Sequence, residues 1–381
     1  MTNNCNITLE FDCKVADFIK SNIRSYYDLI LVVLGCLGNC LSVYAFLGTK
    51  LRYSSSSIYL GALAINDNIF LLLGVFIPWL RTWGVNIFNQ QGFCQFIQYF
   101  GYVSSFLNAW LVVAFTVERY IAVKWPLRRQ FLCTVVRAKM TVTGLTVSAI
   151  LLSSPIIYLT RKTTDQDCGS NKNIENDENL RRLSEIYNTI DSIVSFVVPL
   201  ITIVIFNMLI ARNIYKLDNI RRTLTIESNV SNDRAHASRD RMPQTKVTKM
   251  LLVVSTTFLC LNLPAVVIRI IVFIYNQKIE ELLWLYWAQQ IVQALFYTSF
   301  GINFILYCAS GQNFRREILR MCGKRSRRNT TSGTITSHGN QCVSELTSRS
   351  NLTTKRQYSV ETTLSTELSA DAKTSSKRIM I

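Results

Sequence analysis

The chain has 381 residues, of which 49% are hydrophobic and only 17% are charged, and its apolar residues come in long blocks. An ordinary soluble protein is less apolar and more charged, so this composition favours a membrane protein. The formal net charge is +17, but the basic residues cluster in short segments beside the apolar runs, so nucleic acid is not an expected partner. The eleven cysteines include no Cys-x-x-Cys pair, so no zinc site is expected.

Seven apolar runs are long enough to cross a bilayer, because an α-helix rises about 1.5 Å per residue and a span takes roughly 20 residues. Backbone polar groups find no water inside hydrocarbon, so these runs are predicted as helices rather than loops. Their approximate limits are 29–47, 58–80, 93–117, 140–160, 186–210, 250–275 and 282–308. The predicted fold class is therefore an all-α membrane protein, a seven-transmembrane helix bundle.

The direction of the bundle follows from Lys and Arg, which gather in cytoplasmic loops. Segment 121–139 is basic without an acid and 212–249 is also basic, whereas 161–182 balances acids against bases. The amino end is thus predicted outside the cell and the carboxyl end inside. Residues 1–25 are polar without an apolar core, so no signal peptide is predicted and the first span is expected to direct membrane insertion. The Asn6-Ile7-Thr8 sequon then lies where glycosylation occurs.

The chain beyond the seventh span starts with an amphipathic segment, 312–321, which has Phe314 and Ile318 on one side and arginines on the other. It is predicted as a short eighth helix. Cys322 follows as a palmitoylation candidate, with an unmodified thiol as the alternative. Three domains are predicted. Residues 1–25 form an extracellular tail and residues 26–322 form the membrane domain with the eighth helix. Residues 323–381 form a Ser/Thr-rich cytoplasmic tail, which is expected to be disordered and phosphorylated. Segment 217–245 is predicted to be a polar, flexible linker.

The third span has the most specific motif. It starts at Cys94, contains no charge before Glu118, and ends in Glu118-Arg119-Tyr120, with Pro126-Leu127 shortly after. Adjacent residues of a helix project about 100° apart, so the acid and the base leave the helix in different directions.

Four polar residues lie deep in apolar spans: Asn39, Asp67, Asn108 and Asn303. An ionisable group at such depth is costly, so Asp67 is predicted to face the bundle interior and to find partners or water there. Hydrogen bonding between helices would account for the asparagines alone.

These motifs together resemble the rhodopsin-like (class A) G-protein-coupled receptors. In that family the third helix begins at a disulfide-bonded Cys and ends in Asp/Glu-Arg-Tyr, with the Arg 25 residues after the Cys, as Arg119 follows Cys94 here. Further signatures of the family match at Gly38-Asn39, 63–67 and 303–307. Within it, residues 26–322 are similar to invertebrate FMRFamide- and myosuppressin-type neuropeptide receptors and, more distantly, to thyrotropin-releasing-hormone receptors.

The resemblance implies roles for several residues. It implies a disulfide between Cys94 and Cys168, the only cysteine of the second outer loop. It implies a switch in which Arg119 pairs with its acidic neighbour when inactive and meets a G protein when released, although a pair that merely anchors the helix is the alternative. The switch residues are Glu118, Arg119, Tyr120, Asn303 and Tyr307. The candidates for an allosteric sodium ion, the one cofactor considered, are Asp67, Asn108 and Asn303.

Departures from the family pattern concern four positions. Asn262 stands where Trp usually lies two residues before the sixth-span Pro264, and Asn207 where Tyr usually follows the fifth-span Pro. The usual Trp of the fourth span is missing, and Phe304 stands where Pro normally follows Asn in the seventh. The usual aromatic relay of the family is therefore in question.

The ligand class is narrowed by two absences. Gly101 stands where amine receptors have an Asp, and Tyr297 where opsins have the retinal-binding Lys. The ligand-binding candidates near the outer ends of the spans are Gln98, Tyr102, Glu185, Asp191, Arg269, Gln290, Gln293 and Tyr297. An amidated peptide with a basic residue needs an acid, Asp191 or Glu185, and amide partners, from Arg269, Gln293 or Tyr297. Alternatively, Asp191 and Arg269 pair with each other and only hold the bundle closed.

The sequence therefore predicts a plasma-membrane receptor, not an enzyme, activated by an extracellular ligand, with a short amidated neuropeptide as the favoured class. A chemosensory or lipid ligand in the same fold is the alternative, and a membrane transporter is disfavoured because no internal repeat is visible. Expected partners are a heterotrimeric G protein, arrestin and receptor kinases at the tail, and membrane lipid.

Overall fold

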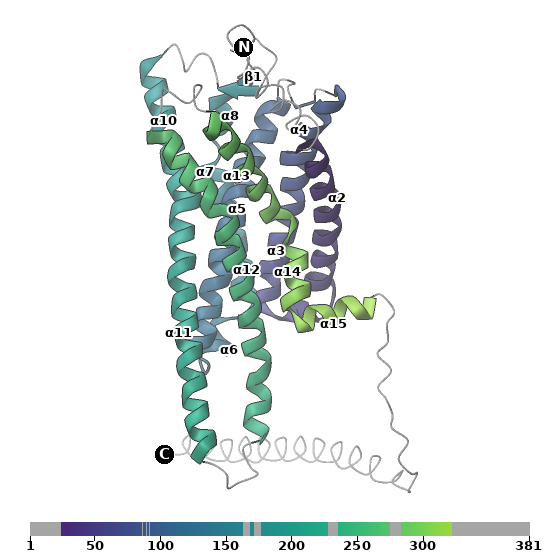
Figure 1. Cartoon of the computed structure of the whole chain (residues 1–381), viewed down its shortest axis with the longest axis vertical. Coiled ribbons are helices and arrows are strands. Elements are labelled where there is room, and N and C mark those ends of the chain that lie inside the picture. Colours follow the sequence, from purple (N-terminus) through teal and green to yellow (C-terminus); the bar gives the residue numbers. More distant parts are fainter. Residues whose placement is uncertain are drawn as a thin grey trace, which may run out of the picture. The chain divides into compact units, whose positions relative to one another are not determined.

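The computed structural model describes residues 24–85, 87–88, 90, 92–162, 168–170, 177–227, 235–274 and 283–321. Long helices run side by side in a bundle, and α15 (Gln312–Met321) lies across one end of it (Figure 1). That end is called the Arg119 end below, and the opposite one, where β1 lies, is called the Cys94 end. The predicted glycosylation site at Asn6 and the predicted palmitoylation site at Cys322 lie outside the described residues. So do both predicted tails, except for residues 24–25, with which the first helix begins.

The rods of the bundle are partly built from several helical pieces. In chain order they are α2 (Arg24–Val43) with η2 (Tyr44–Gly48); α3 (Ser55–Phe70) with η4 (Leu71–Phe76), α4 (Ile77–Leu80) and η5 (Arg81–Trp83); α5 (Phe93–Lys124); α7 (Val135–Leu152) with α8 (Ile156–Leu159); α10 (Glu178–Ser192) with η6 (Ile193–Val197) and α11 (Val198–Glu227); α12 (Ala235–Ile274); and α13 (Leu283–Gly301) with α14 (Asn303–Ser310). Connections contain η3 (Lys50–Tyr53) and α6 (Arg129–Leu132), and β1 (Thr160–Lys162) pairs antiparallel with β2 (Cys168–Ser170).

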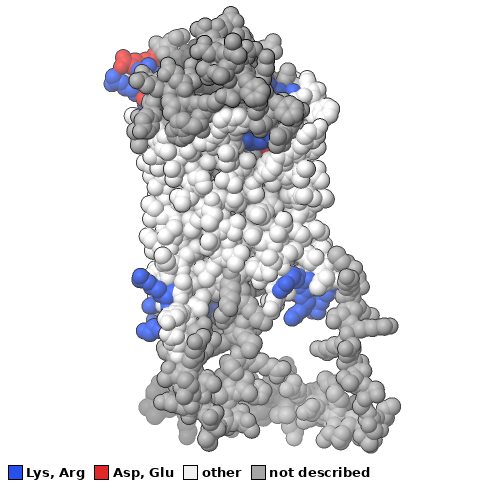
Figure 2. Space-filling model, in the orientation of Figure 1, with Lys and Arg blue, Asp and Glu red and all other residues white. Residues whose placement is uncertain are grey.

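The predicted membrane spans are confirmed. Among the described residues, six helical rods are long and apolar enough to cross a membrane, and a seventh is counted when Trp287–Gly301 and Asn303–Ser310, bent by 55°, are taken together. Figure 2 shows a broad belt of uncharged atoms between two levels at which charged side chains gather. Such a belt is what hydrocarbon requires of a protein surface.

Helix limits are the main point on which the prediction was wrong. The segment 217–245 was expected to be a linker, but α11 continues to Glu227 and α12 already begins at Ala235. Extending an existing helix needs no new nucleation, so polar residues of good helix propensity continue it beyond the apolar span. The fifth rod also starts earlier than predicted, at Glu178, because the Asp177 carboxylate caps it by accepting from the Asn179 N–H at 2.9 Å.

The core of the bundle is centred on α5, which packs against α3, α7 and α11. The first and last rods approach closely because glycines face each other. A Cβ added at Gly35 would lie 3.1 Å from the Cα of Gly301, and one added at Gly38 would lie 2.8 Å from the Cβ of Phe304. The absence of side chains at these positions lets α2 pack directly against α13 and α14.

The bend in the seventh rod forms although Phe304 replaces the usual proline. It falls at Ile302, between α13 and α14. Nδ2 of Asn303 donates to the carbonyl of Ser299, four residues earlier, at 3.3 Å. A side chain that inserts into the backbone hydrogen-bond ladder is a known cause of a kink. The bend brings Asn303 next to the second rod.

Candidate functional site

The centre of the bundle contains a buried carboxylate, that of Asp67, which has no exposed surface. Its Oδ1 accepts from Nδ2 of Asn108 at 2.9 Å, and its Oδ2 accepts from Nδ2 of Asn303 at 2.8 Å. These side chains come from α3, α5 and α14, so the structure brings together the three residues predicted as a sodium site. Each carboxylate oxygen has an amide donor, which offsets part of the cost of burying the group.

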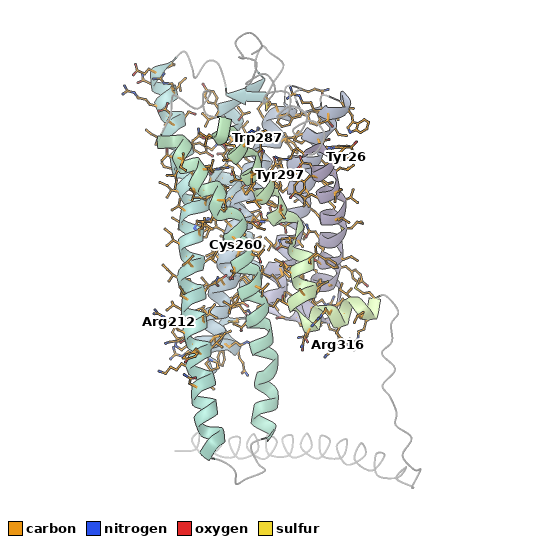
Figure 3. All side chains as sticks on the ribbon, in the orientation of Figure 1. Tyr26, Arg212, Cys260, Trp287, Tyr297 and Arg316 are labelled. Atoms are coloured by element: carbon orange, nitrogen blue, oxygen red, sulfur yellow. A yellow bond between two sulfur atoms is a disulfide. The ribbon has the colours of Figure 1, made fainter. Side chains whose placement is uncertain are left out.

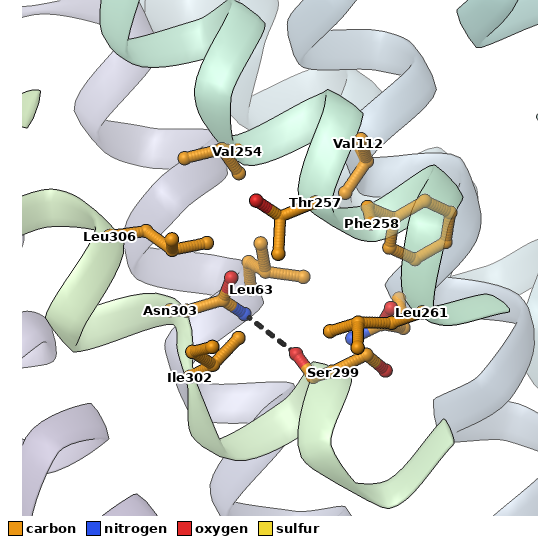
Figure 4. Close-up of a pocket in the computed structure, with 11 residues that line it drawn as sticks. Leu63, Val112, Val254, Thr257, Phe258, Leu261, Ser299, Ile302, Asn303 and Leu306 are labelled. Atoms are coloured by element: carbon orange, nitrogen blue, oxygen red, sulfur yellow. Dashed lines mark hydrogen bonds between the residues drawn. The ribbon is translucent and has the colours of Figure 1, made fainter. Parts of the chain in front are cut away.

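A small cavity lies beside this cluster (Figure 4). Its volume is about 10 Å³, close to the space of one water molecule. Asn108, Ser299 and Asn303 line it, whereas Asp67 does not. An asparagine offers either an oxygen or a nitrogen, depending on how its amide is turned. With the amides turned, their oxygens and the carboxylate would form an oxygen-rich set of the kind that suits a hard cation such as sodium.

At the Arg119 end of α5, Glu118 and Arg119 form a buried ion pair; the two residues are 7% and 5% exposed. The same carboxylate oxygen, Oε1 of Glu118, accepts from Nη2 of Arg119 at 2.9 Å and from the hydroxyls of Ser55 at 2.8 Å and Ser56 at 3.3 Å. The Nε of Arg119 is buried without a partner among the described residues. A buried donor without a partner costs free energy, so the guanidinium has hydrogen-bonding capacity that this arrangement does not use.

The other predicted switch residues lie apart from this pair. Tyr120 packs against Phe206 of α11, with ring centroids 5.2 Å apart. Tyr307 is fully buried, 5.2 Å from the Phe46 ring, and among the described residues its hydroxyl has no partner. Asn303 belongs to the Asp67 cluster. The five residues therefore occupy four separate environments.

Two sets of hydrogen bonds at the Arg119 half of the bundle were missed at the sequence level. One is the bonding of Ser55 and Ser56 to Glu118, for which the run of serines at 54–57 was the available signal. The other joins α11 to α12, where Oγ of Ser255 donates to Oδ1 of Asn207 at 3.0 Å. Asn207, noted only as a departure from the pattern, therefore links two rods.

At the Cys94 end, the predicted disulfide is present: Cys94, at the start of α5, is bonded to Cys168 in β2. The bond attaches the β1–β2 hairpin to the bundle. The connection between the fourth and fifth rods is thereby tied to α5 at this end of the molecule (Figure 1).

A mixed-charge cluster lies in the same half of the bundle. Tyr102 of α5, Asp191 of α10 and Arg269 of α12 interact electrostatically. The Arg269 guanidinium lies 4.4 Å from the centroid of the Phe196 ring, a cation–π contact. Oδ1 of Asp191 accepts from the hydroxyl of Ser195 at 3.0 Å. Among the described residues no ion pair within 4.0 Å joins Asp191 to Arg269, so the alternative of a direct pair does not match this structure.

The seventh rod contributes a second polar group, and α2 covers it. Nε2 of Gln293 donates to the hydroxyl of Tyr297 at 2.8 Å. Nη1 of Arg24 donates to the carbonyl and Oε1 of Gln290 at 3.2 and 3.3 Å, and its guanidinium lies 5.2 Å from the Tyr297 ring centroid. Asp28 pairs with Arg24 at 3.0 Å. Figure 3 shows Tyr297 in the half of the bundle toward the Cys94 end. Arg24 was missed, although its i,i+4 pairing with an acid was visible in the sequence.

Two further residues were predicted to bind the ligand, Glu185 and Gln98, and the structure places them differently. Glu185 is exposed on α10, with Arg181 4.0 Å away, and belongs to neither polar group. Gln98 is half-buried on α5, one helical turn before Tyr102. Asp191 is therefore the better placed of the two acids that the sequence offered.

Comparisons with known proteins agree with this geometry. The family described as 7 transmembrane receptor (rhodopsin family) matches residues 38–307. The chain is 26% identical over 321 residues to the thyrotropin-releasing hormone receptor of Gallus gallus, covering 77% of each chain, and 27% identical over 314 residues to that of Bos taurus, covering 77% of this chain and 76% of the relative. It is 26% identical over 317 residues to the FMRFamide receptor of Drosophila melanogaster, covering 78% of this chain and 53% of the relative.

Proposed function

Because the chain belongs to the rhodopsin family of seven-transmembrane receptors, we propose that it relays the binding of a short amidated peptide outside the cell to heterotrimeric G proteins inside it. As a member of that family it is a multi-pass membrane protein and a G-protein-coupled receptor rather than an enzyme. Relatives named for thyrotropin-releasing hormone and for FMRFamide support a peptide ligand. The second name spells an amidated peptide that contains an arginine.

The arrangement of Asp191 and Arg269 is the observation that supports this proposal most. The two groups interact across one region of the Cys94 end without contacting each other directly. Asp191 has one hydroxyl partner, so its carboxylate keeps capacity for the guanidinium of a peptide arginine. No described hydrogen bond uses the N–H groups of Arg269, which stacks on Phe196 and can donate to the oxygen of a terminal amide. A basic, amidated peptide has the complementary pair of groups.

The polar group of the seventh rod supports the same class of ligand. Gln290, Gln293 and Tyr297 offer neutral donors and acceptors, which suit the backbone of a short peptide. Arg24 stacks on Tyr297 and bonds Gln290, and the carboxylate of Asp28 balances its charge. This side of the proposed site is therefore polar but nearly neutral, whereas the Asp191 side is proposed to distinguish basic peptides from neutral ones. Tyr102 and Gln98, on neighbouring turns of α5, complete the proposed set.

The proposed orientation has the Cys94 end outside the cell at the plasma membrane. A disulfide persists in an oxidising environment, which supports this direction. Basic side chains of the short connections gather at the Arg119 end, as the positive-inside rule requires of a cytoplasmic face: Lys50, Arg52, Lys124, Arg128, Arg129 and Arg137.

The paired state of Glu118 and Arg119 is the proposed resting state. A peptide that binds the open state more tightly shifts the population towards it, and a G protein that binds the same state raises peptide affinity reciprocally. Release of Arg119 from Glu118 gives the guanidinium to the G protein. Tyr120, Asn303 and Tyr307 are proposed to change partners in the same transition. Among the described residues the buried Tyr307 hydroxyl has no partner, so it is able to gain one.

A sodium ion is proposed as an allosteric ligand of the resting state, held by Asp67 with Asn108, Asn303 and Ser299. The oxygen-rich set and the adjoining cavity support this proposal. The bound ion would supply a positive charge opposite the Asp67 carboxylate. The chain's own part is to hold that carboxylate at the junction of α3, α5 and α14.

The test is a panel of amidated peptides applied to cells that express the receptor, with G-protein activation as the readout. An arginine-containing agonist is then compared with an analogue in which glutamine replaces the arginine. Asp191→Asn should weaken the arginine peptide by about 10- to 150-fold, since a hydrogen bond to a charged group contributes about 1.5–3 kcal/mol. The glutamine analogue should be equally potent on both receptors.

The matched control is Glu185→Gln, which removes an exposed acid from the same helix and should change neither potency. A loss confined to Glu185→Gln would transfer the role to the other predicted acid. Equal losses for both peptides on Asp191→Asn would refute the charge assignment. Activation only by lipids or small volatile compounds would refute the peptide class.

A further inference from the structure

An open hollow lies at the Arg119 end, between the end of the first rod and α15, at the opposite end of the bundle from the proposed ligand-binding groups. Its volume is about 640 Å³, within the range of about 300–1,000 Å³ that is usual for small-molecule sites. It is lined by backbone and side chains of η2 and η3 on one side and of α15 on the other. It is called the basic hollow here, after its main lining residues: Lys50, Arg52, Arg320, Tyr44, Tyr53 and Glu317.

The charge of the basic hollow is strongly unbalanced. Three cationic side chains face a single carboxylate, that of Glu317, which pairs with Arg320 at 2.9 Å. Arg52 donates to the hydroxyl of Tyr53 at 2.9 Å and stacks over its ring at 5.0 Å. Lys50 has neither a hydrogen bond nor an ion pair among the described residues. The hollow therefore offers separated positive charges to an anion with several charged groups.

The walls of the basic hollow are held in place by packing. Phe314 of α15 is 2% exposed, and its ring centroid lies 5.0 Å from that of Phe46 in η2 and 5.6 Å from that of Tyr307. These contacts attach α15 to the end of the first rod. The Tyr44 ring lies against Gly48, where an added Cβ would meet ring atoms at 3.3 Å. The hollow is thus preformed rather than a gap beside a loosely attached helix.

An apolar, exposed stripe leads into the hollow along the first rod. Leu34, Leu37, Leu41 and Tyr44 are 64%, 61%, 40% and 55% exposed, and their spacing puts them on one helix face. Tyr44 both ends this stripe and lines the hollow. A ligand with a polyanionic head and hydrocarbon chains would match both features, because its chains would lie on the stripe while its head reaches the cations. A soluble phosphate would use only the cations.

We propose that the basic hollow binds the phosphorylated inositol headgroup of a phosphoinositide, with the acyl chains of this lipid along the Leu37–Tyr44 face. Arg52 and Arg320 suit phosphate because guanidinium donates two parallel hydrogen bonds, and Lys50 adds a point charge. Cytoplasmic leaflets attract basic segments through their anionic lipids. A phosphatidylserine headgroup contains an ammonium group that would meet these same cations, so a polyphosphorylated inositol is the better match.

The experiment uses the full-length receptor in nanodiscs of phosphatidylcholine, with a fluorescent phosphatidylinositol 4,5-bisphosphate as the titrated lipid. The variant Lys50→Gln/Arg52→Gln/Arg320→Gln removes the three cations of the hollow. Its matched control, Arg128→Gln/Arg212→Gln/Arg316→Gln, removes three exposed cations that do not line the hollow; Arg212 and Arg316 are labelled in Figure 3. The hollow variant should bind the lipid at least about tenfold more weakly, and the control should stay within about twofold of the wild type.

Further arms of the experiment separate the possible sources of the anion. Phosphatidylserine at equal total charge should compete poorly, and so should soluble inositol trisphosphate. Equal losses in the two triple variants would overturn the proposal, because the effect would then be one of general charge. Equal competition by phosphatidylserine would overturn the headgroup assignment, and equal affinity for soluble inositol trisphosphate would overturn the lipid assignment.

A simpler variant keeps the proposal testable if the triple variant is not monodisperse. Lys50→Gln alone removes a cation without a described partner and should weaken lipid binding by about threefold; unchanged binding would contradict the proposal. None of these measurements needs a peptide or a G protein, so their outcome is independent of the proposed function.

Discussion

Neutralising Glu118 is the most direct test of the proposed switch. Glu118→Gln keeps the size of the side chain and one oxygen that can accept from Ser55 and Arg119, but it removes the negative charge from a pair that is 7% and 5% exposed. The substitution destabilises only the resting state, because the released Arg119 of the open state no longer contacts this carboxylate. The variant should therefore signal without agonist.

The size of the effect follows from burial. Removing one partner of a buried ion pair costs about 3–5 kcal/mol, and the retained oxygen puts the expected value near the lower bound. A shift of about 3 kcal/mol is roughly 150-fold in an equilibrium constant. A receptor that is open about 0.1% of the time would then be open more than about 10% of the time.

A matched exposed pair provides the control. Glu178 and Arg182 lie 2.6 Å apart, closer than the 2.9 Å of the buried pair, but their side chains are 66% and 69% exposed. Glu178→Gln should change the equilibrium by less than about 1 kcal/mol. The assay is agonist-independent nucleotide exchange on purified G protein, normalised to receptor amount. Basal exchange of Glu118→Gln within twofold of the wild type, or an equal rise in both variants, would refute the reasoning.

Three further predictions concern other parts of the bundle. Sodium chloride, but not choline chloride, should raise the melting temperature of the wild-type receptor, because a bound ion stabilises the folded state by mass action. The variant Asp67→Asn should have the same melting temperature in both salts. Equal stabilisation of both receptors by sodium would contradict the proposed site. Gly38→Ala should lower the melting temperature in detergent, with a loss of about 1–3 kcal/mol of stability, because its Cβ would lie 2.8 Å from that of Phe304. The control Gly144→Ala should not lower it, because nothing lies within 4 Å of the added Cβ. Alkylation of Cys133, followed on its own peptide by mass spectrometry, should keep accelerating above pH 9, because burial raises the pKa of this thiol and only the thiolate reacts; a rate that levels off by pH 9 would contradict this.

The parts of the site that the sequence predicted are those with a local signature. A carboxylate in the middle of an apolar span must find polar partners, so Asp67 was recognisable from depth alone, and Asn108 and Asn303 stood at comparable depth in other spans. The Glu118-Arg119 pair and the Cys94–Cys168 disulfide were predicted through the resemblance to a receptor family, and both are present in the structure.

Partners that meet only through packing were not predictable in this way. Ser55 lies 63 residues from Glu118 in the chain, and Arg24 lies 266 residues from Gln290. No periodicity in either segment identifies the other. The same holds for the basic hollow, whose cations come from η3 and α15 and meet because Phe314 docks on Phe46.

The sequence by itself determined that this protein crosses the membrane in helices, because hydrocarbon leaves a backbone no other partner than its own carbonyls and so makes each span a local property. Only the tertiary structure decided which buried side chains meet and where the rods bend. Those outcomes depend on how glycines, rings and amides from distant segments fit together, as Gly38 fits Phe304 and Asn303 reaches Asp67.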